Sequence, residues 1–195
     1  MTEPKIKGSA IRELLLWHDQ RYGHADTVAL SDRLPPHLLA MLDTSQPALG
    51  ILGASWYPCT LTHPMLDRVI EMHGGDEGRE FANAANRDVV PKMIRGVYKM
   101  VFRTAATPEL YARHIQRLWR RLHTTGDRSI TIASPGEATS VVANWPGHHP
   151  FLCWTTIYTM AYVFEAMGYA HWTVERTGCV GHGAPRCETI LRYRR

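Results

Sequence analysis

The sequence contains no long uninterrupted run of apolar residues. The opening segment MTEPKIKGSA is polar, and the next apolar run, Leu14 to Trp17, is followed at once by His18 and Asp19. A secretory signal or a membrane-spanning helix needs a longer apolar stretch than this. We therefore expect a cytoplasmic protein that does not bind a membrane.

Cysteine is scarce, and charge of one sign does not dominate. Four cysteines in 195 residues, without a secretory signal, favour reduced thiols or a metal site over a framework of disulfide bonds. The net charge of +4 is spread along the chain, so no nucleic-acid partner is expected. Four arginines do gather on one predicted helix, where a solvated face is the simpler interpretation. These are Arg113, Arg117, Arg120 and Arg121, with Leu110, His114, Leu118 and Leu122 predicted on the buried side.

Signatures of enzymes are also missing from the sequence. It has no glycine-rich phosphate loop, no Gly-x-Ser-x-Gly, no His-Glu-x-x-His and no close pair of acids. A nucleophilic cysteine needs a nearby base. The only candidate nucleophile outside the cysteine tail is Cys59, with His63 four residues later as its possible base. His63 itself is more simply a hydrogen-bonded or surface side chain. We expect no catalytic residue and no enzymatic activity.

Helical patterns fill the first two-thirds of the chain. Thr107 followed by Pro108 is typical of a helix start, and Gly23 and Gly126 are typical of helix ends. A helix beginning at Ser9 heads the series, and Pro91 opens a further apolar face through Met93, Ile94, Val97, Met100 and Val101. The predicted helices cover about 9–22, 25–31, 36–43, 61–73, 78–88, 91–101 and 107–125.

The pattern changes after residue 126. Residues 129–133 and 138–143 alternate like the strands of a hairpin, and 171–177 and 188–193 predict a second one. Between them, 150–167 predicts a helix that is buried on most of its circumference and ends at Gly168. The sequence therefore predicts an α+β fold, with a C-terminal antiparallel sheet crossed by one long helix. We expect one domain over 1–195, with a mainly helical part (1–125) and a hairpin-helix-hairpin part (126–195).

Three of the four cysteines fall after residue 150. Cys153 stands near the start of the long helix, while Cys179 and Cys187 enclose a turn-rich loop, Val180 to Arg186. Such a loop can bring two sulfurs within about 4 Å of each other, as joint ligation of a metal requires. Because cysteine is also a small buried apolar residue, the cysteines alone leave both interpretations open.

A carboxylate stands close to this group. Glu175 and Cys179 are separated by an even number of residues, so in a regular strand both side chains face one side. A bulge at Gly178 would disturb that arrangement. His149 offers another donor, one helical turn before Cys153.

The tail Glu175…Cys179-x7-Cys187-Glu-Thr-Ile-Leu resembles the ending of the 4-vinyl reductase domain family. That family includes sensor domains of phenol-responsive transcription activators, in which Cys, Glu, Cys and Cys hold a structural zinc. The resemblance implies zinc ligation by Cys153, Cys179 and Cys187. Glu175 is the nearest match to the carboxylate, one residue out of register. The substitutes for this fourth ligand are histidines, namely His149, His171 and His182.

The whole chain also resembles a myxobacterial paralogous family of unknown function. The shared segments are Lys7-Gly8-Ser9, Trp56-Tyr57-Pro58, Gly78-Arg79-Glu80 and the cysteine tail. This resemblance spans nearly all 195 residues, and its specific part is the cysteine tail.

The resemblance implies a sensory or regulatory domain with a structural zinc clamp and an apolar pocket for a small hydrophobic molecule. Trp154, Tyr158 and Tyr162, at helical spacing, are core residues or line that pocket. A homodimer or a signalling protein partner would pass the signal on. Two alternatives stay open. One is an interaction or dimerisation scaffold without a ligand, and the other is a haem- or tetrapyrrole-binding protein with a histidine as iron ligand.

Overall fold

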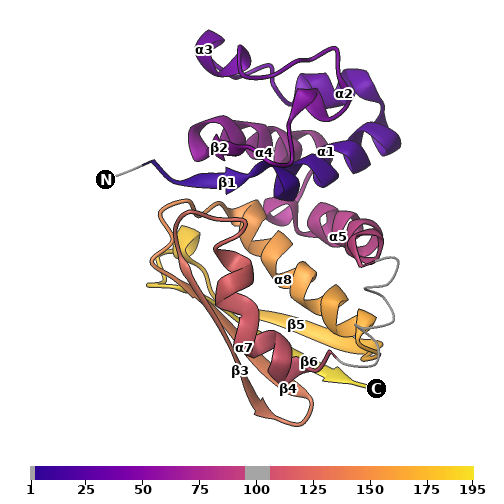
Figure 1. The fold of residues 1–195 in the computed structure, drawn as a ribbon, viewed down its shortest axis with the longest axis vertical. Helices are drawn as coiled ribbons and strands as arrows, with labels where there is room; N and C mark the ends of the chain where they lie inside the picture. The colour runs from indigo at the N-terminus through magenta and orange to yellow at the C-terminus, as the bar shows by residue number, and fades with distance from the viewer. Residues whose placement is uncertain (1–2, 95–105) are drawn as a thin grey trace.

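A computed structural model describes residues 3–94 and 106–195 of the chain (Figure 1). The N-terminal half, drawn in indigo and magenta, is mainly helical. Its elements are β1 (Lys5–Lys7), α1 (Gly8–Tyr22), α2 (His24–Ala29), α3 (Pro36–Leu39), the 3-10 helix η1 (Pro47–Gly50), β2 (Trp56–Pro58), α4 (Cys59–His73), the 3-10 helix η2 (Asp76–Gly78) and α5 (Arg79–Met93).

The C-terminal half consists of a sheet and two helices. Its elements are α7 (Pro108–Trp119), β3 (Asp127–Ser134), β4 (Glu137–Ala143), α8 (Pro150–Ala166), β5 (His171–Gly178), the 3-10 helix η3 (Val180–His182) and β6 (Cys187–Arg194). The four strands form an antiparallel sheet in the order β3-β4-β6-β5. This arrangement confirms the predicted α+β class and the two predicted hairpins.

One face of the sheet carries the core of this half. Alternate residues of β4 and β6 are buried, as expected for a sheet with one covered face. Helices α7 and α8 pack on that face (Figure 1). The shared core includes Ile115 of α7 and Phe164 of α8, which meet Ile130, Ala138 and Leu191 of the strands.

Helix α8 is the central element of the molecule. Its sheet side faces β5 and β6, and its other side packs along α5 of the N-terminal half. Both sides are therefore buried, including Phe151 and Phe164 at 0% exposure. The prediction of a helix buried on most of its circumference is confirmed, and the glycine at its end, Gly168, has φ 100°.

Helix α7 starts as predicted but buries a different side. The Thr107 hydroxyl accepts a hydrogen bond from the Leu110 backbone N–H at 3.2 Å, which is N-cap geometry. The predicted buried face of Leu110, His114 and Leu118 is wrong, because these residues are exposed and Tyr111, Ile115 and Trp119 face the core. Ile115 and Trp119 are each only 3% exposed. All four arginines of this helix region are exposed.

One strand was not predicted, and two helix boundaries differ from the prediction. Trp56–Pro58 pairs as strand β2 with β1, with Ile6 opposite Tyr57. Helix α1 begins at Gly8 after Lys7, so Ser9 is not its N-cap. Helix α5 runs through Pro91 to Met93 instead of ending near Asp88. The rest of the predicted apolar face after Pro91, Val97, Met100 and Val101, lies outside the described residues. Among the residues that are described, no helix is long and apolar enough to cross a membrane.

Candidate metal centre

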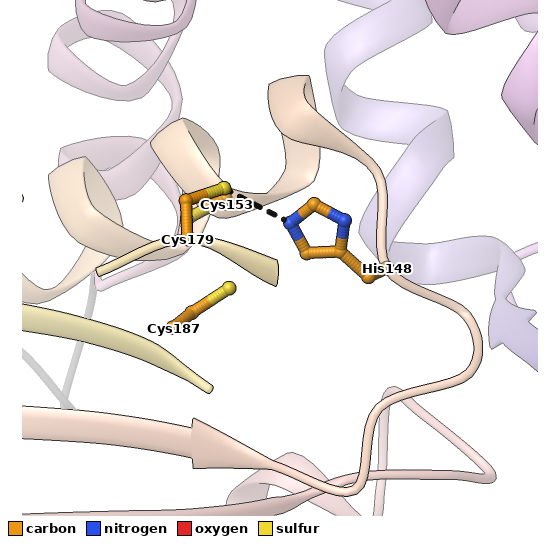
Figure 2. Close-up of side chains that lie close together, drawn as sticks. All are labelled: His148, Cys153, Cys179 and Cys187. Atoms are coloured by element: carbon orange, nitrogen blue, oxygen red, sulfur yellow. Dashed lines mark hydrogen bonds between the residues drawn. The ribbon is translucent and has the colours of Figure 1, made fainter. Parts of the chain in front are cut away.

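Four side chains converge between α8 and the end of the β5–β6 hairpin (Figure 2). They are Cys153, Cys179, Cys187 and His148, and their ligand atoms all lie within 4.8 Å of one another. The three cysteines are 2%, 3% and 4% exposed. The structure thus brings together the three cysteines that the sequence predicts as ligands. The fourth residue, His148, was not predicted.

Local geometry explains how the hairpin delivers its two thiols. Cys179 directly follows β5, and Cys187 is the first residue of β6. The loop between them folds back on itself, because the backbone N–H groups of His182 and Ala184 both donate to the Cys179 carbonyl, at 3.0 and 3.1 Å. The Val180 N–H lies 3.5 Å from the Cys187 sulfur. Backbone groups of the loop therefore hold both ends of the site.

Glu175 is not part of this group. The register between β5 and β6 shifts between Arg176 and Gly178, which is a β-bulge. One extra residue reverses the side on which every later side chain lies, so Cys179 is buried while Glu175 is exposed. The Glu175 carboxylate instead accepts a hydrogen bond from Arg192 at 2.9 Å on the outer face of the sheet.

His148 stands where Glu175 was expected. Its Nε2 lies 3.5 Å from the Cys179 sulfur, and its ring packs edge-on against Trp145. The loop backbone approaches this imidazole closely, since a Cβ added to Gly181 would lie 3.0 Å from His148 Cε1. Adjacency to His149 was the only sequence signal for this residue.

The other proposed histidines have different roles. His149 caps α8: its Nδ1 accepts from the Phe151 N–H at 3.2 Å, and its Nε2 lies 3.0 Å from Asp67 Oδ1. His171 is exposed at the start of β5. His182 donates to Glu77 of η2. None of these three is in the group of four.

The thiols are electrostatically unequal. The Cys153 thiol donates a hydrogen bond to the Cys187 sulfur, which lowers the pKa of Cys187 to about 4. The same hydrogen bond, together with burial, raises the pKa of Cys153. Burial also raises the pKa of Cys179. Cys187 is therefore the first thiolate of the group, supported by His148 and the Val180 N–H.

The group has the donor set of a metal centre. Three thiolates and an imidazole are ligands of soft or borderline transition-metal ions, and four such donors suit a tetrahedral ion. In a site of this kind sulfur atoms lie roughly 3.8 Å apart, which small side-chain movements from the present spacing would provide. The fourth cysteine is separate: burial raises the pKa of Cys59 to about 11, so its thiol stays protonated.

Within the described residues, one small cavity lies beside the thiols. Ser140, Thr189, Thr156 and the thiols Cys153 and Cys187 belong to the lining of a cavity of about 10 Å³ between α8 and the sheet. That volume holds about one water molecule. Trp154, Tyr158 and Tyr162 are buried and belong to the core around α8.

Comparisons with known proteins establish the fold only. No family model matches the sequence, and no curated protein matches it. An H-NOX protein from S. oneidensis, solved in the Fe(II)NO ligation state, is 11% identical, with a TM-score of 0.70 over 97% of this chain and 100% of that chain. An oxygen-binding H-NOX domain related to soluble guanylate cyclases, solved as the oxygen complex, is 8% identical, with a TM-score of 0.63 over 97% of this chain and 96% of that one. A structure from work on haem distortion in the H-NOX family has a TM-score of 0.62 at 8% identity, over 97% and 96% of the two chains.

These likenesses correct two expectations. The chain has the H-NOX fold, so the expected 4-vinyl reductase-type fold is wrong. A cysteine hairpin followed by a short strand is a local pattern that can sit on different folds. The expected structural zinc is contradicted as well, because the proteins with this fold are described with iron and haem.

Two buried histidines, His18 and His149, are not free to ligate haem iron. Haem iron needs an axial side chain with a free donor atom. His18 has both ring nitrogens engaged, with Thr27 and His73 at 2.8 Å each, and His149 has both engaged as well. His114 of α7 is exposed, and His123 is stacked 3.9 Å from Trp119. His63 differs from His18 and His149, because its buried Nε2 has no hydrogen-bond partner among the described residues.

One buried cation is nonetheless without a carboxylate among the described residues. Arg128 of β3 is 7% exposed, and its Nη2 donates weakly to the Thr156 carbonyl at 3.4 Å. Its Nε has no hydrogen-bond partner. Burial lowers the pKa of this guanidinium, with Tyr111 as its polar neighbour. Arg128 would suit an acidic group of a bound molecule, a haem propionate included.

Proposed function

We propose that the chain is a small-molecule sensory domain built on the H-NOX fold. The observation that carries the proposal is the fold likeness, which runs through almost the whole of this chain and the whole of a solved H-NOX protein. Those proteins are described as complexes with nitric oxide or oxygen, so the fold accommodates ligands of that size. The fold alone does not select the ligand of this chain.

Among the alternatives, the fold favours a haem- or tetrapyrrole-binding protein over a hydrophobic ligand held beside a zinc clamp. Arg128 supports this candidate, and so does His63, whose buried Nε2 has no partner among the described residues, whereas His18 and His149 have both ring nitrogens engaged. The test is the absorption spectrum of the purified chain, before and after addition of hemin under reducing conditions. A Soret band that disappears in Arg128→Leu supports the candidate. A chain that stays colourless with hemin rejects it.

A second observation supports a metal ion in the same domain. Cys153, Cys179, Cys187 and His148 are the described residues that would hold it, with His148 in the position predicted for Glu175. These side chains come from a loop, a helix and a hairpin, and they meet only in the folded chain. Binding of an ion would therefore stabilise the fold directly. The proposed role is structural, because all four positions of a tetrahedral ion are filled by protein atoms.

Cobalt(II) is a suitable probe of this centre, because tetrahedral cobalt thiolates absorb visible light. We expect about one cobalt per chain, together with loss of the absorption in Cys179→Ala and in Cys187→Ala. Cys59→Ala is the matched control, since this cysteine is buried but lies outside the group. Elemental analysis of the chain as purified identifies the resident ion. Equal cobalt binding by all three variants would reject the centre.

A homodimer or a signalling protein is the proposed partner of such a domain. A sensory domain needs a surface that a second protein binds. Light scattering of the purified chain distinguishes a dimer from a monomer.

A further inference from the structure

Glu77 connects the two halves of the molecule at the metal centre. It lies in η2, between α4 and α5, and its carboxylate receives hydrogen bonds from three elements of the C-terminal half. Trp154 of α8 donates from Nε1 at 3.2 Å, Arg176 of β5 donates at 2.5 Å, and His182 of the cysteine loop donates to the other oxygen. Its side chain is 22% exposed.

Arg176 is shared between Glu77 and the thiol group. The same Nη1 that donates to Glu77 lies 3.9 Å from the Cys179 sulfur. The guanidinium also stacks on Trp154, 4.2 Å from the ring centroid, and its side chain is 11% exposed. Three thiolates and a neutral imidazole leave a site with a divalent ion negatively charged, and Arg176 offsets that charge.

The backbone around Glu77 is strained. Gly75, Asp76, Glu77 and Gly78 all have positive φ, at 52°, 42°, 56° and 73°. Glycine adopts this conformation freely, but Asp76 and Glu77 pay a conformational energy for it. The Asp76 carboxylate lies 3.6 Å from Arg79 at the surface, so only Glu77 gains contacts with the other half that offset the strain.

We propose that Glu77 is a positioning residue for the metal centre: it holds Arg176 and the loop 180–186 in the arrangement that binds the ion. This inference rests on the proposed metal centre and assigns its regulation. Loss of the ion removes the link between Cys153, Cys179 and Cys187 and so frees the loop that carries His182. Arg176, which lies next to Cys179, and His182 then lose their fixed positions, and the strained η2 segment relaxes. Occupancy of the centre is thereby coupled to the segment between α4 and α5, and the coupling is reciprocal.

The first test measures release of cobalt(II) from the full chain to a chelator. In Glu77→Gln, we expect release about fivefold faster than in the parent, since Arg176 and His182 lose their anionic partner. Asp76→Asn is the matched control, because it removes a neighbouring carboxylate from the same strained segment without touching the hairpin; release should stay at the parent rate. Glu77→Asp, which keeps the charge, should fall between the parent and Glu77→Gln.

The second test is hydrogen exchange of residues 74–80 with and without cobalt(II). We expect faster exchange in this segment when the ion is removed, and no such change in Glu77→Gln, in which the segment is already released. A parent chain that binds no metal overturns the proposed centre and this inference with it. A parent that binds cobalt, while Glu77→Gln and Asp76→Asn release it equally fast, overturns this inference alone.

Discussion

His148 Nε2 lies 3.5 Å from the Cys179 sulfur, although 31 residues separate the two in the chain. The neighbouring histidine, His149, faces away from the thiols and caps α8. His148 is thus the proposed metal ligand and His149 the helix cap, and a variant of each residue can distinguish these two roles.

We expect His148→Ala to weaken cobalt(II) binding by about tenfold or more, because one of four ligands is removed. His149→Ala should bind cobalt as the parent does but lose about 1 kcal/mol of unfolding free energy with the helix cap. Titration of the charge-transfer absorption measures the first effect, and urea unfolding measures the second. Weaker cobalt binding in His149→Ala alone would show that the ligand assignment is reversed.

Glu175→Gln should leave metal affinity unchanged. Its carboxylate pairs with Arg192 on the outer face, where both side chains are more than half exposed, at 57% and 52%. An exposed pair of this kind contributes little to stability, because solvent and salt screen it. Equilibrium binding of cobalt(II) to parent and variant is the measurement. A large loss of affinity would place Glu175 among the ligands after all.

Stability should fall as the pH drops below 7, partly because of His18. This residue is 1% exposed, and burial, followed by the neighbouring His73, lowers its pKa to about 4. Asp26 and Asp19, the nearby acids, raise it only in part. In the unfolded chain the pKa of His18 is about 6.5. Below that pH the unfolded state binds a proton at His18 that the folded state does not bind. The stabilisation is present above pH 6.5 and is lost as the pH approaches 4.

Between pH 7 and pH 5 this effect amounts to about 2 kcal/mol. Urea unfolding at the two pH values measures it, with His18→Gln expected to show a smaller difference and His37→Gln, at an exposed position, the parent difference. An NMR titration of the His18 ring gives an independent check. A ring that titrates near pH 6.5 in the folded chain would contradict the prediction.

Gly78→Ala should destabilise the chain more than Gly168→Ala. Both glycines have positive φ, at 73° and 100°, so either alanine costs about 1 kcal/mol of backbone strain. At Gly78 the new Cβ would also lie 2.7 Å from Phe151 Cδ2, while at Gly168 it would meet nothing within 4 Å. Overpacking adds about 1–3 kcal/mol at Gly78 alone. Equal thermal shifts for the two variants would show that η2 does not pack tightly on α8.

Local signals in the sequence were enough for much of the fold. The start of α7 follows from Thr107 and Pro108, whose roles depend on adjacent residues. Helix α8 and the two hairpins follow from periodicity and from glycine positions. The pairing of β1 with β2 could not be predicted in this way, because each strand has three residues and no period can be read from them.

Predictions that depend on tertiary context were less successful. Helix α7 buries Ile115 and Trp119, whereas Leu110 and Leu118 form a second apolar stripe on its exposed side, so periodicity alone does not identify the buried side. In the metal centre, the three cysteines were found because their residue type is rare and chemically specific. Glu175 was wrongly expected as a ligand, because a single extra residue in β5 decides which of its side chains face inward. His148 was not expected, because it precedes α8 and reaches the thiols only through the tertiary fold.

That bulge has a second consequence at the edge of the sheet. In the described part of the chain, β5 pairs only with β6 and so presents unpaired backbone groups along its other side. A long regular edge is a template on which another chain can add a strand and begin to aggregate. The irregularity before Gly178 shortens the regular stretch and twists its end. The bulge that turns Cys179 inward therefore also makes the edge strand β5 a poorer template for self-association.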